Sequence, residues 1–486
     1  MLFSSSVFLF LFLPLLLLGC LILRRSLRLW LLLFASLFFY AWGEPRYVAV
    51  MLIVCSVSYA GALAVSCSPF LWGKRMALAG SLAIDLCILG YFKYFDFLLQ
   101  NVNALMHTTF ALRHIALPIG ISFFTFQAIS YVVDVYRGTA EPQKNLARLV
   151  LYISFFPQLI AGPIVKYHDI EKDLANNQIH LDDVVYGMER FIIGLAKKIL
   201  LANPLGEIAD PIFQAGYNSA DFPIAWLGAI AYSLQLPVAT AWLGIAAYTL
   251  QIYFDFSGYS DMAIGLGRMF GFHFLENFNY PYISKSITEF WRRWHISLGS
   301  WFKEYVYIPL GGNRKGRYRT YLNLGIVFLL TGIWHGANWT FILWGIWHGL
   351  FIIMERFLGL GKDDGNGRLL WLRHGYTILA FVIGWTMFRA ETVQEGIGFI
   401  ETMFLFRIPL SMPFTLDYYL SMKSVLVLAL AVIFSTPWAM QAGQWFLTKC
   451  SRVGMVCKYG GLLCLFLLSA AYLAASTYNP FIYFRF

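Results

Sequence analysis

Long apolar runs without a charged residue recur along the chain and constrain its fold more than any other feature. Residues 7–23 form one such run, and residues 321–354 form another that lacks Asp, Glu, Lys and Arg. Only 13% of the 486 residues are charged, which is about half of the usual 25% in soluble domains. Such runs suit membrane-spanning helices. The sequence therefore predicts an all-α polytopic membrane protein and excludes a soluble enzyme, a disordered chain and a disulfide scaffold.

The spacing of the cysteines and the net charge further limit the functions that the chain can have. The seven cysteines show no metal-type spacing and are interpreted as packing residues, so neither a metal site nor a bound cofactor is predicted. The net charge of +10 is interpreted as a topology signal and as contact with anionic membrane lipids. Nucleic-acid binding is not expected. No polar linker of domain size separates the runs, which predicts one domain over residues 1–486.

The early loops indicate the orientation of the chain. Arg24, Arg25 and Arg28 follow the first apolar run instead of preceding it, so this run is a helix and not a cleaved signal. Because basic loops stay in the cytoplasm, the N-terminus is expected in the periplasm. At about 20 residues per span, roughly 10–13 embedded helices are expected. The first five spans are predicted at residues 7–23, 28–42, 47–67, 76–99 and 115–133.

Two further segments depart from simple spans. Residues 149–165 are apolar but contain Pro157 and Pro163, which predicts a kinked or re-entrant segment. Residues 225–235 return almost unchanged as residues 241–251, offset by 16 positions. Two copies are too few for a solenoid, so this is a local duplication whose effect on the structure stays open.

Ionisable residues enter the apolar phase most densely between residues 255 and 348. The first group is Asp255, Ser257 and Asp261, within an otherwise apolar helix. Ionisable groups at membrane depth are costly, so they indicate function unless they have a structural reason. Two interpretations stay open here: a helix break that caps itself with Asp and Ser side chains, and a lining for substrate.

Residues 285–303 combine large apolar residues with basic ones. Three tryptophans and a leucine recur three or four positions apart between residues 291 and 301, which predicts an amphipathic helix in the membrane interface. Between residues 285 and 319, eight basic residues oppose two acidic ones. This charge indicates headgroup anchoring or a cytoplasmic mouth that attracts a phosphate-rich acyl carrier. The candidates for donor binding are Arg292, Arg293 and Lys303.

The uncharged run at residues 321–354 is too long for one span and too short for two. A helix broken at Gly332 and Gly336 fits this length. His335 lies at the break beside Asn338 and two tryptophans. His335 can be interpreted as a buried histidine that bonds a carbonyl, or as a catalytic or substrate-binding residue. At membrane depth the catalytic or substrate-binding interpretation is favoured.

A single histidine with no metal cluster beside it suits general-base catalysis, because its ordinary pKa lies near the working pH. In such a reaction an acceptor hydroxyl, deprotonated by His335, attacks a thioester. The carbonyl of the thioester would be polarised by a donor such as Asn338 or a tryptophan N–H.

Seven segments spread over nearly the whole chain carry a resemblance to a known family: Leu117–Gln127, Leu159–Pro163, Tyr253–Gly265, Glu289–Ser297, Leu310–Asn313, Trp334–Asn338 and Asn479–Phe486. In these segments the sequence resembles the membrane-bound O-acyltransferase family, most closely its alginate O-acetyltransferase branch. The resemblance implies a ring of helices around a tunnel with a catalytic histidine inside. His335 matches that histidine, and His295 matches a second family histidine nearer the cytoplasm. The implied catalytic core spans residues 115–356, with C-terminal helices over residues 369–486.

The resemblance also implies a reaction. An acetyl group would pass from a cytoplasmic donor, acetyl-CoA, across the inner membrane to an exported polysaccharide, with alginate as the expected polymer. Periplasmic proteins of the same pathway would complete the transfer. His335 would act as general base or transient acyl carrier, and His295 would support or relay. The alternatives are acylation of peptidoglycan or cellulose, D-alanylation of teichoic acid, and a non-catalytic transporter or scaffold of an export complex.

Overall fold

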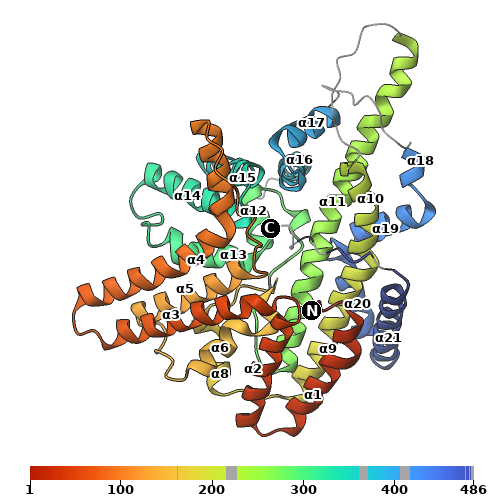
Figure 1. Cartoon of the computed structure of the whole chain (residues 1–486). Helices are drawn as coiled ribbons and strands as arrows, with labels where there is room; N and C mark the ends of the chain where they lie inside the picture. The colour runs from red at the N-terminus through yellow and green to blue at the C-terminus, as the bar shows by residue number, and fades with distance from the viewer. Residues whose placement is uncertain are drawn as a thin grey trace. The chain divides into compact units, whose positions relative to one another are not determined.

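Helices form all the regular structure in the described part of the chain (Figure 1). The computed structural model describes residues 1–160, 162–214, 227–360, 370–404, 416–476, 478–480 and 482. In hydrocarbon every backbone N–H and C=O must find a partner within the protein, and a helix meets this requirement locally. The predicted all-α architecture is confirmed.

Two compact units divide the chain. The first comprises Met1–Leu195, Tyr259–Asn277 and Ser300–Tyr305. The second comprises Ala196–Gly258, Phe278–Gly299 and Val306–Phe486. The division separates the predicted site residues: both histidines and Asp255 belong to the second unit, whereas Asp261 and Lys303 belong to the first. The expected single domain over residues 1–486 stays a prediction.

The first unit contains five N-terminal helices that overlap the five predicted spans, although α4 begins at Leu71, before the predicted residue 76, and α5 begins at Ile121, after the predicted residue 115. Helices α3, α4 and α5 pack side by side (Figure 1). The segment with the two prolines is broken, because α6 ends at Ser154 and α7 begins at Phe156, directly before Pro157. The helices are α1 (Leu13–Ile22, after a π-helical turn at Phe8–Phe12), α2 (Arg25–Ala41), α3 (Val48–Cys67), α4 (Leu71–Met106), α5 (Ile121–Arg137), α6 (Leu146–Ser154), α7 (Phe156–Leu159), α8 (Tyr167–Ala175) and α9 (Leu181–Ala196).

The second unit holds most of the remaining helices. Helix α11 runs unbroken over 43 residues, so of the two interpretations left open for residues 255–261 the helix break is not found. The second copy of the duplicated segment lies within α11, and the first copy begins at residues outside the described range. The helices are α10 (Asn203–Gln214), α11 (Leu227–Met269), α12 (Ile287–Arg293), α13 (Ile296–Phe302), α14 (Arg317–His335), α15 (Trp339–Leu358), α16 (Leu370–Arg389), α17 (Val393–Met403), α18 (Leu416–Tyr419), α19 (Met422–Phe434), α20 (Trp438–Lys449) and α21 (Ser451–Ala475).

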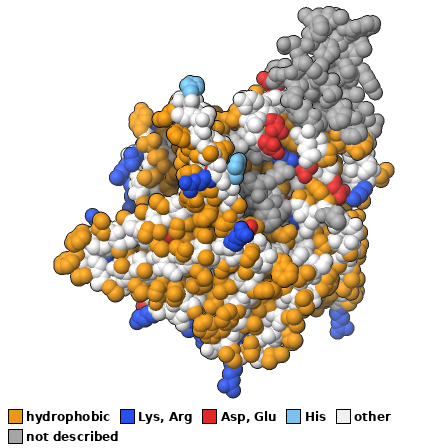
Figure 2. Space-filling view, viewed as in Figure 1, with side chains coloured by type: hydrophobic (Ala, Val, Ile, Leu, Met, Phe, Trp, Pro, Cys, Tyr) orange, Lys and Arg blue, Asp and Glu red, His pale blue; other side chains and the backbone are white. Residues whose placement is uncertain are grey.

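Within the described residues, three helical segments are long and apolar enough to cross a membrane: Pro45–Cys67, Trp339–Leu358 and Ser451–Ala475. Helices α19 and α20, bent by 70°, form a fourth candidate. Other long helices, such as α4, carry charged residues that lower their hydropathy. The visible face of the protein is covered mostly by hydrophobic side chains, with few charged ones (Figure 2). Such a surface suits contact with lipid, while the number of 10–13 embedded helices stays a prediction.

Helices α14 and α15 form a closely packed hairpin in place of one broken span. Together the two helices extend beyond both ends of the uncharged run at residues 321–354, because α14 begins at Arg317 and α15 ends at Leu358. Gly332 and Gly345 face each other where the helices cross. A Cβ on Gly332 would lie 2.5 Å from the carbonyl oxygen of Phe341, and a Cβ on Gly345 would lie 2.5 Å from that of Phe328. Gly332 therefore serves close packing and not the predicted turn, which occurs at Gly336.

The variant Gly345→Ala tests this packing. Its methyl group must push the backbones of α14 and α15 apart, which we expect to lower the free energy of unfolding by about 1–3 kcal/mol. The matched control is Gly325→Ala on α14, where the nearest atom to the added Cβ is 4.0 Å away. Thermal unfolding of the detergent-solubilised protein measures both variants. Equal melting temperatures for the two would contradict the packing role.

Candidate active site

His335 is the last residue of α14 and stands at the turn of the hairpin. The chain leaves the helix at Gly336, and α15 begins three residues later. Asn338 caps α15, because its side-chain oxygen accepts a hydrogen bond from the Thr340 N–H at 3.1 Å. The Asn338 amide also donates to the carbonyl of Glu391 at 2.8 Å. The predicted break beside His335 is confirmed, and the imidazole is held at a capped turn.

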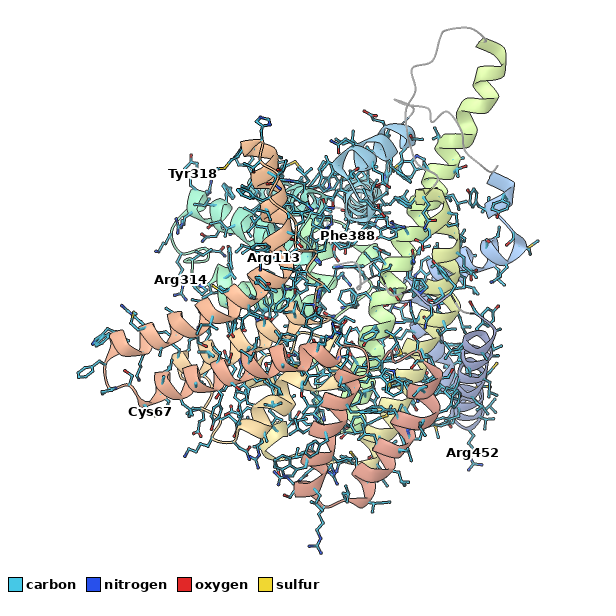
Figure 3. The ribbon with its side chains drawn as sticks, in the orientation of Figure 1. Cys67, Arg113, Arg314, Tyr318, Phe388 and Arg452 are labelled. Atoms are coloured by element: carbon cyan, nitrogen blue, oxygen red, sulfur yellow. The ribbon has the colours of Figure 1, made fainter. Side chains whose placement is uncertain are left out.

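Aromatic side chains enclose the His335 ring. The ring centroids of Trp344 and Phe388 lie 4.8 and 5.1 Å away, and the His335 side chain is buried. Phe388 lies on α16, within a crowded group of side chains (Figure 3). A small cavity of about 20 Å³ opens here, enough for one group of about the size of a water molecule. Its lining residues are Ile252, Asp255, Phe256, Trp294, His335, Trp344, Trp385, Phe388 and Ile482.

His295 joins two short helices in place of the single amphipathic helix that was predicted. Helix α12 ends at Arg293, α13 begins at Ile296, and His295 has a left-handed backbone with a φ of 46°. Of the apolar stripe, Trp294, Leu298 and Trp301 are buried within the protein, and Trp291 is half-buried. The ring of Trp334 is 6.1 Å from His295 and 4.9 Å from His335. The structure thus brings the two predicted histidines to the same tryptophan.

Glu355 holds the first of these short helices in place, a function that the sequence analysis missed. This fully buried carboxylate on α15 accepts hydrogen bonds from the N–H groups of Ile287 and Thr288, at 2.6 and 2.8 Å. The Thr288 hydroxyl donates to it as well, at 2.6 Å. A carboxylate at a helix N-terminus satisfies free N–H groups and complements the helix dipole. Glu355 therefore fixes α12, and with it the turn at His295, against the hairpin.

Asp255 anchors the C-terminal tail beside the cavity. One carboxylate oxygen lies 2.5 Å from the buried Lys198 ammonium, and the other accepts a hydrogen bond from the Ile482 N–H at 2.9 Å. Lys198 also donates to the carbonyl of Pro480. Because Ile482 lines the cavity with His335, the ion pair positions one wall of the site. Two interpretations were open for Asp255: a helix cap and a lining for substrate. The structure shows that Asp255 anchors the tail and that it also lines the cavity.

A larger polar chamber of about 370 Å³ shares Phe388 and Ile482 with the small cavity. Arg389 and Asp210 line this chamber and form an ion pair of 2.9 Å. Asp210 also accepts a hydrogen bond from the hydroxyl of Tyr478 at 2.6 Å, so it ties the tail to α16. The chamber contains carboxylate, guanidinium and amide groups, which suit contact with hydroxyl-rich molecules.

The other predicted residues lie apart from this cavity. Ser257 is buried on α11 and does not line it. Asp261 forms an ion pair of 2.7 Å with Arg190 in the first unit. Arg293 bonds Glu289 at 2.9 Å and the carbonyl of Asn279 at 3.1 Å. Arg292 and Lys303 have exposed side chains, which leaves both accessible to a soluble anion.

The ion pair between Asp255 and Lys198 predicts that removing one charge lowers the stability of the protein more than removing both. Asp255→Asn leaves the Lys198 charge buried without its counter-ion, which we expect to cost about 3–5 kcal/mol. The double variant Asp255→Asn with Lys198→Gln removes both charges and should regain part of this loss. Thermal unfolding in detergent measures the double variant and the two single variants, Asp255→Asn and Lys198→Gln. A double variant that is as unstable as the sum of the two single ones would rule out the coupling.

Comparison with known proteins defines the class to which this fold and site belong. Residues 88–360 match the sequence profile of the membrane-bound O-acyltransferase family. The chain belongs to this family and is an O-acyltransferase of its alginate branch.

Three relatives show how the similarity is distributed. A probable alginate O-acetylase of Pseudomonas putida is 41% identical over 522 residues, which cover 100% of both chains. That of Pseudomonas syringae pv. tomato is 45% identical over 84% of this chain and 76% of its own length. A peptidoglycan O-acetyltransferase of Helicobacter pylori is 35% identical over 83% and 80%, respectively. The resemblance inferred from the motifs is therefore confirmed.

Proposed function

We propose that this protein is an inner-membrane O-acetyltransferase that supplies acetyl groups for an exported polysaccharide, alginate. It takes the acetyl group from acetyl-CoA on the cytoplasmic side and passes it across the membrane, where periplasmic proteins complete the transfer. The observation that carries the proposal is the placement of His335 at a capped turn, inside a cavity of about 20 Å³. The names of the relatives in Pseudomonas support alginate as the polymer.

His335 performs the proton transfer in this proposal. The imidazole takes the proton of an acceptor hydroxyl while the oxygen attacks the thioester carbonyl, so that a C–O bond forms. The C–S bond then breaks, and the imidazolium returns the proton to the leaving thiolate. His295 supports the site from the other side of Trp334.

The oxyanion that forms during the attack needs a hydrogen-bond donor. Asn338 is less suitable than expected, because it already caps α15 and bonds the carbonyl of Glu391. The indole of Trp344 lines the cavity, and its N–H has no hydrogen-bond partner among the described residues. Trp344 is therefore the preferred donor.

The variant His335→Ala tests the assignment. We expect the acetyl ester content of the exported polysaccharide to fall by at least 100-fold, since a positioned acid–base residue contributes about 10²–10⁴-fold in rate. Membrane abundance of the variant must stay normal. His180→Ala, which changes an exposed histidine, is the control and should leave the esters unchanged. Unaltered esters in His335→Ala would instead favour a transporter or scaffold function.

Arg292 is proposed to attract the phosphates of the donor, because its side chain is exposed on α12. We expect Arg292→Gln to raise the apparent KM for acetyl-CoA about 5- to 10-fold with little change in kcat, which corresponds to the loss of one charge-assisted contact. Release of free thiol from acetyl-CoA by isolated membranes measures both constants. Arg293→Gln is the matched comparison, because Arg293 bonds Glu289 and the Asn279 carbonyl; it should affect stability more than KM. An unchanged KM in Arg292→Gln would remove Arg292 from the donor site.

Peptidoglycan is the second candidate acceptor, because the Helicobacter pylori relative acts on it by name. The two possibilities differ in which polymer carries the esters. Acetyl analysis of alginate and of purified peptidoglycan from cells with and without the protein distinguishes them.

A further inference from the structure

A second group of ionisable side chains gathers in the first unit and includes neither His335 nor His295. It lies where α5, α8 and the π-helical turn Lys303–Tyr307 meet. One carboxylate oxygen each from Asp134 and Glu304 and a ring nitrogen of His168 lie within 4.8 Å of one another. Asp169 adds an oxygen 3.3 Å from Nε2 of His168. Asp134 is fully buried, and the other three side chains are largely buried.

Asp134 sets the orientation of the His168 ring. Its Oδ2 lies 2.9 Å from Nδ1 of His168, while its Oδ1 accepts a hydrogen bond from the Tyr305 hydroxyl at 2.7 Å. With Nδ1 held in this way, Nε2 faces Oδ1 of Asp169 at 3.3 Å and Oε1 of Glu304 at 3.8 Å. Histidines that bind metals usually have their second nitrogen on a carboxylate, which fixes the ring and makes it a better ligand.

The distances around Nε2 suit joint coordination of an ion better than direct hydrogen bonding. Ligand atoms placed about 2.0–2.1 Å from a tetrahedral Zn²⁺ lie roughly 3.3 Å apart. The separations of 3.3 and 3.8 Å are close to this value. Both exceed the usual N–H···O distance of about 2.9 Å.

The net negative charge of the group would also be balanced by a divalent cation. Asp134, Asp169 and Glu304 carry three negative charges, and Lys166 offsets one of them from 2.7 Å away from Glu304. Counted with His168 in the neutral form in which a histidine binds a metal, the net formal charge is −2. Arg137 does not change this balance by pairing, because it donates to the main-chain carbonyl of Glu304 at 3.1 Å and lies over the Tyr305 ring.

We propose that His168, Asp169 and Glu304 bind one divalent transition-metal ion, for which Zn²⁺ is the best match, and that Asp134 positions His168. One nitrogen and two oxygen ligands suit Zn²⁺, whereas Mg²⁺ and Ca²⁺ favour oxygen alone. The ion would join α8 to the π-helical turn, and Asp134 would join both to α5. Its effect is thus on the stability of the first unit, independent of the acyl-transfer reaction.

The test uses the full-length protein in detergent, with any affinity tag removed and bound metals stripped by a chelator. Zn²⁺ alone is then added, and elemental mass spectrometry counts the zinc that stays bound after the free ion is removed. We expect one zinc per chain and a higher melting temperature, with no such effect of Mg²⁺. His168→Gln and Glu304→Gln should weaken zinc binding at least 10-fold, and Asp134→Asn about 10- to 100-fold. His180→Gln, at an exposed position, should bind zinc like the unaltered protein.

A further variant separates a metal site from a network of ion pairs. Lys166→Gln removes the ammonium group, so it should tighten zinc binding several-fold, and zinc should restore the melting temperature. In a network without a metal, Lys166→Gln would lower the melting temperature and zinc would not restore it. The proposal is overturned by that result, by less than stoichiometric zinc on the unaltered protein, or by equal zinc binding in His168→Gln. Size-exclusion chromatography verifies that each variant is folded.

Discussion

The close crossing of α14 and α15 determines where the other parts of the candidate active site can lie. Within a membrane, helices gain little from hiding apolar surface from each other, so close backbone contact becomes a main source of stability. Gly332 and Gly345 provide that contact because neither has a Cβ. The hairpin that results places His335 at its turn and Trp344 against the imidazole. A side chain at either glycine would move both groups.

Buried charges near the cavity organise the protein around the histidine. Asp255 holds the tail, Glu355 holds the start of α12, and Asp210 joins Arg389 to Tyr478. Each carboxylate has protein partners, as buried charges require. The wall around His335 is therefore mostly aromatic and uncharged. In the proposed reaction, a thioester carbonyl beside His335 would meet few competing dipoles, and hydrogen bonds made to it would be strong.

Much of this arrangement could be predicted from local sequence. The remainder depends on contacts between residues that are far apart in the sequence. The uncharged run around residue 335 indicated a break beside the histidine, since neither one span nor two fitted its length. The role predicted for Gly332 was wrong, because sequence alone does not separate a glycine that turns the chain from one that packs closely. The turn at His295 was missed because a left-handed backbone is rare for a residue other than glycine. Residues 134, 168 and 304 are too far apart for any spacing rule to join them.

The tail contacts also bear on the order in which the protein acquires its structure. Asp255 and Ile482 are 227 positions apart, and a contact over so long a loop forms late because closing the loop costs entropy. Domains synthesised on ribosomes fold from the N-terminal side as the chain emerges. The hairpin with its histidine can therefore be complete while one side of the cavity is still open. The wall that Ile482 provides is added afterwards, so the small cavity exists only in chains that have been made and folded as far as Ile482.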